Sequence, residues 1–83
     1  MDSKKRIAIL GSTGSIGTQA IEVITEQSDS FEIEVLTANG NAELLIQQAI
    51  KYKPNAVVIS NESKYLQVKE ALLKYDVKVY AGE

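Results

Sequence analysis

The sequence contains no cysteine and no histidine. Without cysteine, disulfides and thiolate metal sites are excluded, and without histidine the chain lacks the commonest general base and metal ligand. Catalytic systems that pair serine or cysteine with histidine therefore cannot be built from these residues. No apolar run approaches the length of a membrane span, and residues 7–10 are too short for the core of a signal peptide. These absences lead us to expect a cytoplasmic protein.

Charge of either sign is also modest. Nine Lys and Arg residues stand against eleven Asp and Glu residues, so the formal net charge is −2. This balance gives no electrostatic reason to expect nucleic acid or an anionic membrane as a partner. With 83 residues, 45% of them apolar, the chain has the composition of one globular domain at most.

Hydrophobic periodicity changes repeatedly along the chain. Short, apolar, largely β-branched runs alternate with longer amphipathic segments, a pattern typical of parallel strands joined by crossover helices. The expected strands are residues 7–10, 31–38, 56–59 and 77–80, and the expected helices are residues 15–27, 42–52 and 62–75. The pattern predicts an α/β fold, a partial Rossmann-like doubly wound parallel sheet.

Several residues indicate where the helices begin, end and face the core. Asn41 and Asn61 are good N-caps, and Pro54 cannot continue a helix. The inward stripes that helical spacing predicts are Ile16, Ala20, Val23, Ile24 and Gln27, then Leu44, Leu45, Ile46, Ala49 and Ile50, then Tyr65, Val68, Leu72 and Tyr75. Because the chain stops just after a strand, we interpret residues 1–83 as the N-terminal part of a longer nucleotide-binding domain, with catalytic and C-terminal domains absent.

A glycine-rich turn joins the first strand to the first helix. Residues 11–17 read Gly-Ser-Thr-Gly-Ser-Ile-Gly, with glycines at 11, 14 and 17. In such a turn one glycine permits a tight bend, a second lets a diphosphate approach the main chain, and a third lets the helix pack closely. The helix start offers free N–H groups to the anion, and Ser12, Thr13 and Ser15 add hydroxyls. The glycines could also simply turn a tight corner.

The end of the second strand bears on the choice of cofactor. NAD sites usually place a carboxylate there, but residues 39–41 are Asn-Gly-Asn. Asparagine and main-chain N–H groups can donate to a 2′-phosphate, so the sequence favours NADP over NAD, although no Lys or Arg stands at this corner. The same residues also suit a plain turn with a helix cap. Glu32 and Glu34 could form a paired-carboxylate site, but a solvated strand end explains them more simply.

Residues 7–17, Ile-Ala-Ile-Leu-Gly-Ser-Thr-Gly-Ser-Ile-Gly, closely resemble the opening of the 1-deoxy-D-xylulose 5-phosphate reductoisomerases. Residues 35–41 with Leu44 and Leu45, and residues 53–59, resemble the same family. The resemblance implies an NADPH-dependent enzyme that rearranges and reduces 1-deoxy-D-xylulose 5-phosphate to 2-C-methyl-D-erythritol 4-phosphate in non-mevalonate isoprenoid biosynthesis. Such an enzyme binds a phosphosugar substrate and a divalent metal, Mg or Mn, and forms a homodimer.

The resemblance also assigns site residues. The implied cofactor contacts are Gly11, Thr13, Gly14, Ser15, Ile16 and Gly17 in the turn, and Asn39, Gly40 and Asn41 at the second corner. Gly40 stands where some members have Lys or Arg. The family's metal-ligand motifs do not occur in these residues, so no catalytic or metal residue is assigned, and this piece alone is expected to be inactive.

Two other functions stay open at this point. Semialdehyde-type dehydrogenases can share a turn with glycines at this spacing, and would need a nucleophilic cysteine downstream. A non-catalytic NADP-binding redox sensor of the atypical short-chain type would need no downstream carboxylate cluster. Whatever the function, a strand edge left open by truncation predicts self-association of the isolated piece.

Overall fold

The computed structural model describes residues 5–27 and 30–82, in which strands and helices alternate. The elements in chain order are β1 (Lys5–Ile9), α1 (Ser15–Glu26), β2 (Phe31–Ala38), α2 (Ala42–Tyr52), β3 (Ala56–Ile59), the short 3-10 helix η1 (Glu62–Lys64), α3 (Tyr65–Ala71) and β4 (Lys78–Ala81). No helix in these two ranges combines the length and the apolar character that a membrane crossing requires.

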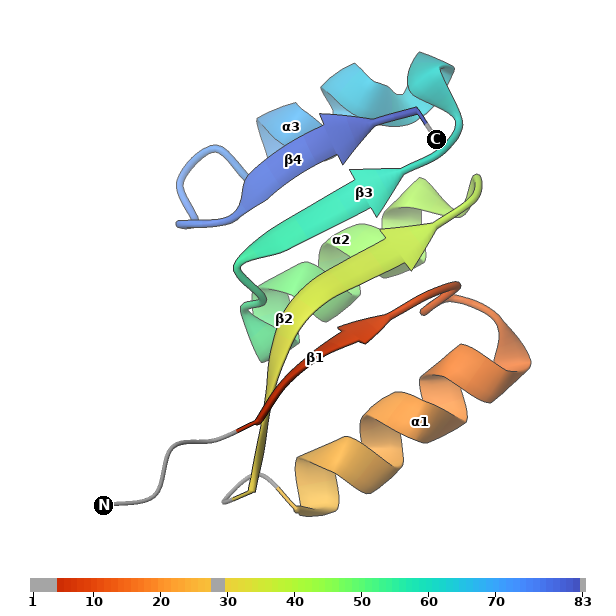
Figure 1. The fold of residues 1–83 in the computed structure, drawn as a ribbon. Coiled ribbons are helices and arrows are strands. Elements are labelled where there is room, and N and C mark those ends of the chain that lie inside the picture. Colours follow the sequence, from red (N-terminus) through yellow and green to blue (C-terminus); the bar gives the residue numbers. More distant parts are fainter. Residues whose placement is uncertain (1–4, 28–29, 83) are drawn as a thin grey trace.

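The strands form one parallel sheet in the order β1-β2-β3-β4, which confirms the predicted α/β fold (Figure 1). Each strand therefore lies beside its neighbour in sequence, and β1 and β4 form the two edges. The pairing of β1 with β2 shifts register between Ile7 and Ala8, where β2 carries the extra residue Glu34. Because all strands run the same way, every strand-to-helix turn lies at the same end of the sheet, where the carboxyl ends of the strands meet.

A single hydrophobic core joins one face of the sheet to the helices. Strand residues such as Ile9, Leu36 and Val57 pack against Ile21 of α1, Leu45 of α2 and helical residues of α3. In Figure 1, α2 and α3 lie behind the sheet, and α1 runs beside β1. Among the described residues, the buried members of this cluster are Ile9, Ile21, Leu36, Ala38, Ala42, Leu45, Ala49, Val57, Ile59, Val68 and Leu72.

The middle of the chain follows the sequence expectations residue for residue. The boundaries of β2, α2 and β3 are those predicted. The side chain of Asn41 accepts a hydrogen bond from the Leu44 N–H at 3.2 Å, as an N-cap does. At the other end, Lys53 adopts a left-handed conformation with φ of 52° directly before Pro54, which ends α2.

The third helix is shorter than predicted. The side chain of Asn61 accepts from the Ser63 N–H, as expected of a cap, but residues 62–64 form η1 and α3 ends at Ala71. Beyond it the main chain tightens, because the N–H of Leu73 bonds to the carbonyl of Glu70 and that of Tyr75 to Leu72. These bonds span three residues instead of four, so the expected helix 62–75 closes in tight turns.

The first helix faces the core with only part of the predicted stripe. Ile16 and Val23 are 82% and 55% exposed, whereas the buried residues of α1 are Gly17 and Ile21. Ile24 of the predicted stripe packs against the core and Ala20 is half-buried, so the core-facing side of α1 is turned from the expected one toward Gly17 and Ile21. The cause lies at Gly17, which packs against the main chain of the preceding turn and so brings Ile21 inward one turn later.

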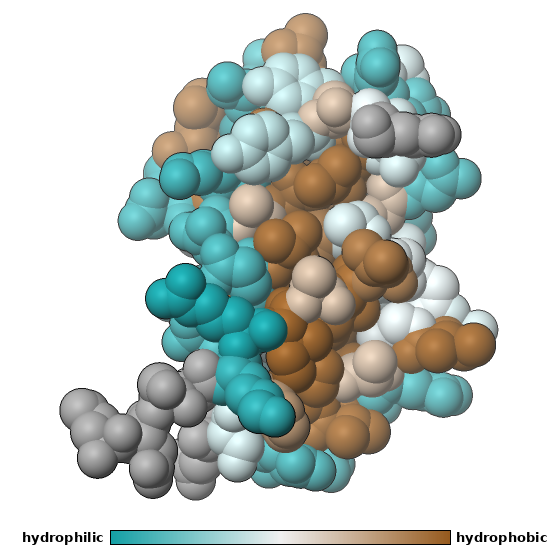
Figure 2. Space-filling view, viewed as in Figure 1, coloured by the Kyte–Doolittle hydropathy of each residue, from teal (hydrophilic) through white to brown (hydrophobic). Residues whose placement is uncertain are grey.

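The first strand was predicted at residues 7–10, and its continuous apolar run would suit burial on both faces, but the structure differs on both points. The strand is Lys5–Ile9, and Leu10 lies in the following turn with 77% of its surface exposed. Side chains alternate between the faces of a strand, so the residues next to the core positions lie on the opposite face. On that face Ala8 and Tyr80 are exposed, and Val35 is half-buried. Figure 2 shows the result as a hydrophobic band across the middle of the molecule.

This open face and the free edge of β1 predict self-association of the isolated chain, because unpaired strand edges and large apolar patches tend to pair with other copies. Sedimentation velocity over a range of concentrations is expected to show species larger than a monomer. Ala8→Lys places a charge on the exposed part of β1 and should shift the distribution toward monomer. A monomeric profile of the unsubstituted chain at every concentration would contradict the prediction.

Candidate nucleotide-binding site

Three glycines shape the turn between β1 and α1, each for a different reason. Gly11 has a φ of +67°, a left-handed conformation that favours glycine, and a Cβ there would meet no atom within 4 Å. Gly17 is buried, and a Cβ there would lie 2.1 Å from the carbonyl oxygen of Gly11. These two glycines confirm the tight bend and the close helix packing that the sequence predicts.

Gly14 is different, because neither its backbone nor its packing requires glycine. Its φ is −79° and ψ 171°, which any residue adopts, and a Cβ would meet only the Gly11 carbonyl oxygen at an ordinary 3.5 Å. It is exposed at the N-cap of α1. The structure therefore leaves the surface above Gly14 free for a ligand that approaches the main chain closely.

The first turn of α1 presents main-chain donors at the same place. The N–H of Gly14 bonds to Gly11, and that of Thr18 to Gly14. Between them, the N–H groups of Ser15, Ile16 and Gly17 have no acceptor among the residues that the structure describes. Free N–H groups at a helix start, together with the positive end of the helix dipole, favour an anion.

Strand β2 holds the turn by accepting two hydrogen bonds from it. The N–H of Gly11 donates to the Thr37 hydroxyl at 2.9 Å, and the N–H of Ser12 donates to the Thr37 carbonyl at 2.7 Å. Thr37 thus fixes the start of the turn through both its side chain and its main chain. Nothing in the sequence pattern distinguished Thr37 from its neighbours, and only the parallel pairing of β1 with β2 brings it here.

The Ser12 hydroxyl was predicted to face the anion, but it is not available to a ligand. Its side chain is fully buried and donates to Oε1 of Gln48 at 2.7 Å. Of the expected hydroxyl donors, Ser15 is exposed and Thr13 half-buried, so these two stay on the accessible side of the turn. Gln48 is a residue that sequence reasoning missed, because a polar residue within an apolar helical stripe gives no sign of its partner.

The second corner, between β2 and α2, consists of Asn39, Gly40 and Asn41, all exposed. The side-chain oxygen Oδ1 of Asn41 accepts the capping hydrogen bond of α2, which leaves the side-chain nitrogen Nδ2 free to donate. A Cβ at Gly40 would meet only the amide nitrogen of Asn61, at 3.9 Å, so this position has room for a side chain. No carboxylate and no cation is found at residues 39–41.

The two corners lie at the same edge of the sheet. Each follows the carboxyl end of its strand, and β1 and β2 are paired neighbours (Figure 1). An open hollow of about 630 Å³ is lined by β1, by the glycine turn and by residues of α1. In open parallel sheets, ligands bind at this carboxyl edge.

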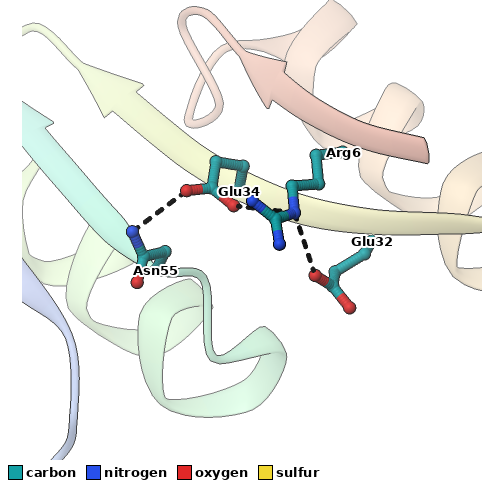
Figure 3. Close-up of polar contacts among 4 residues, drawn as sticks. All are labelled: Arg6, Glu32, Glu34 and Asn55. Carbon is teal, nitrogen blue, oxygen red and sulfur yellow. Dashed lines mark hydrogen bonds and ion pairs between the residues drawn. The ribbon is translucent and has the colours of Figure 1, made fainter. Parts of the chain in front are cut away.

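The two glutamates of β2 lie at the opposite end of the strands (Figure 3). As expected, Glu32 and Glu34 share a side, where each has a carboxylate oxygen 3.9 Å from Nε of Arg6. Glu34 also accepts a hydrogen bond from the Asn55 amide at 3.0 Å. These exposed contacts explain the pair as a surface ion-pair cluster, far in the fold from the glycine turn. Residues 5–27 and 30–82 contain no group of three or more metal-ligating side chains.

The family model for 1-deoxy-D-xylulose 5-phosphate reductoisomerase matches residues 7–83, which include both corners. The chain belongs to the 1-deoxy-D-xylulose 5-phosphate reductoisomerase family. Of the three protein classes that the sequence left open, the match selects the reductoisomerases over the semialdehyde dehydrogenases and the redox sensors.

Known reductoisomerases are similar over nearly the whole chain. The enzyme of Phocaeicola vulgatus is 65% identical over 79 residues, which are 95% of this chain and 21% of that protein. The enzyme of Bacteroides thetaiotaomicron is 62% identical over 81 residues, 98% of this chain and 21% of that protein. The chain thus spans about a fifth of the length of the curated reductoisomerases that it matches.

Solved reductoisomerase structures share the fold. The Zymomonas mobilis reductoisomerase in complex with NADPH superimposes with a TM-score of 0.92 at 34% identity, over 99% of this chain and 22% of that one. A reductoisomerase in complex with NADPH, fosmidomycin and magnesium gives a TM-score of 0.88 at 26% identity, over 95% and 20% of the two chains.

Proposed function

We propose that this chain forms the part of a reductoisomerase that binds the adenosine and diphosphate end of NADPH. The observation that carries the proposal is Gly14, whose missing side chain is required neither by its backbone nor by its packing. It lies beside three main-chain N–H groups without acceptors in the described structure. A ligand with an anionic group against the main chain accounts for both features.

The residues present fit NADPH. The diphosphate would lie on the amides of residues 15–17, with the hydroxyls of Thr13 and Ser15 within its reach. Asn39, Gly40 and Asn41 would donate side-chain and main-chain N–H groups to the 2′-phosphate, and no carboxylate stands there to repel it. When bound, NADPH supplies a hydride, and this chain supplies the binding and orientation of the cofactor.

The remaining functions of the enzyme belong to other parts of it. We infer that conversion of 1-deoxy-D-xylulose 5-phosphate to 2-C-methyl-D-erythritol 4-phosphate, with its Mg or Mn ion, uses residues beyond this segment. Assembly as a homodimer in the cytoplasm is part of the same proposal. The glutamates of β2 are not part of it, because they lie at the amino ends of the strands, away from both corners.

The proposal is tested in a chimeric full-length enzyme, in which the N-terminal segment of the Phocaeicola vulgatus reductoisomerase is exchanged for this chain. We expect saturable NADPH binding by fluorescence titration, at a Kd much lower than that for NADH. Equal binding of both cofactors would contradict the assignment of residues 39–41. A folded chimera that binds neither would contradict the proposed function itself.

Gly40→Arg is expected to strengthen NADPH binding by the chimera. The position is open, its φ is not in the left-handed region, and a guanidinium there would reach the 2′-phosphate. We expect the Kd for NADPH to fall about tenfold at low salt, because a charge-assisted hydrogen bond contributes about 1.5–3 kcal/mol before its ordering cost. The Kd for NADH serves as the control and should not change. A gain for both cofactors would place the arginine on the diphosphate instead.

A further inference from the structure

The core holds two buried polar side chains among the described residues, and they bind each other. Ser12 is fully buried and Gln48 is 6% exposed. The Ser12 hydroxyl donates to Oε1 of Gln48 at 2.7 Å, and Nε2 of Gln48 donates to the carbonyl oxygen of Ser12 at 2.8 Å. The two residues are 36 positions apart, so this pair joins the glycine turn to the middle of α2.

With these bonds every polar group of Ser12 is fixed from within the protein. Its N–H donates to Thr37 of β2, and its hydroxyl and carbonyl are held by Gln48 of α2. The peptide group that follows Ser12 is thereby held with its carbonyl oxygen turned inward. On the other side of the turn, Gly14 and the N–H groups that begin α1 stay exposed.

A buried glutamine needs all of its hydrogen-bond partners, because a buried amide loses much if any partner is missing. The carbonyl of Ser12 points into the core, where neither a strand nor a helix main chain supplies its donor. Gln48 supplies that donor, and its rigid amide fixes the orientation of the peptide.

We propose that Gln48 is a positioning residue for the cofactor, which it does not touch. This inference rests on the proposed function. Gln48 holds the turn in its anion-binding conformation before the diphosphate binds. Such preorganisation strengthens binding, because the turn does not have to be ordered when the ligand binds. Loss of Gln48 should then weaken NADPH binding more than it affects the chemical step.

The test is Gln48→Met in the chimeric full-length enzyme. Methionine keeps the length of the side chain and lacks both amide groups. We expect the Kd for NADPH, measured by fluorescence titration, and its KM to rise about tenfold when both hydrogen bonds to Ser12 are lost, which corresponds to about 1.4 kcal/mol. At saturating NADPH, kcat should stay within about twofold, because Gln48 contacts no reacting atom.

The matched control is Gln47→Met, since Gln47 is exposed on the same helix and its substitution should leave the Kd for NADPH unchanged. Ser12→Ala removes one of the two hydrogen bonds and little volume, and should raise the Kd about threefold even if Gln48→Met does not fold.

An NADPH Kd of Gln48→Met within twofold of that of Gln47→Met would overturn the inference. A fall in kcat as large as the rise in KM would also overturn it, because it would indicate general loosening. If the unsubstituted chimera does not bind NADPH, the proposed function fails and the inference falls with it.

Discussion

Gly17→Ala is expected to destabilise this chain by about 3 kcal/mol or more, a large part of the stability of a small domain. The added Cβ would lie 2.1 Å from the carbonyl oxygen of Gly11 and 2.8 Å from the Cα of Ser12. Both atoms belong to the main chain, so no side chain can rotate away to relieve the contact. Either α1 must move off the sheet, which uncovers Ile21, or the turn must open.

Urea unfolding followed by far-ultraviolet circular dichroism measures this loss. The matched control is Gly40→Ala, because a Cβ at Gly40 has no neighbour closer than 3.9 Å. We expect the control to shift the free energy of unfolding by about 0.5 kcal/mol or less. If the two variants unfold at the same urea concentration, the close packing of α1 on the turn does not limit the size of residue 17.

Gly14→Val is expected to abolish NADPH binding by the chimeric enzyme while the fold survives. The backbone at residue 14 lies in the extended region, which valine adopts readily, so the fold loses only about 1 kcal/mol from a poorer cap. The added methyl groups, however, occupy the surface where the diphosphate would approach the main chain. We expect the Kd for NADPH to rise about 100-fold or more, about 2.7 kcal/mol.

Gly14→Ala separates the two effects, because its Cβ makes only ordinary contact with the Gly11 carbonyl. This variant should keep the melting temperature of the chimera and still bind NADPH more weakly. Unchanged NADPH titration of both variants would show that the diphosphate does not lie against residue 14. A large fall in melting temperature would instead give Gly14 a structural role.

The two glycines have different roles in the turn. Gly17 is fixed by packing within the protein, and Gly14 is left open toward a ligand. The sequence motif predicted both roles, because glycines at these positions serve the same purposes wherever a strand passes into a helix beneath a diphosphate. What the motif did not predict is how the turn is held, through Thr37 and Gln48.

Local signals explain why the central elements were predicted without error. The side chain of Asn41 caps α2, Pro54 follows its last turn, and the β-branched run at residues 56–59 forms a buried strand. Each of these residues affects the main chain only within a few positions along the sequence. The third helix was predicted too long for the same reason, because its apolar spacing continues to Tyr75 after the main chain has tightened into turns.

The sequence by itself determined the strand–helix order, the glycine turn, the caps and the family, because these depend on residue type and short spacing. Only the tertiary structure decided which side of α1 faces the core, which strand face stays open and which polar groups hold the turn. The α1 sequence carries two apolar stripes, through Ile16 and through Ile21, and the contact at Gly17 selects the second. Likewise Ser12 and Gln48 meet only when α2 has packed on the sheet, since a hydrogen bond between residues 36 apart leaves no local trace in the sequence.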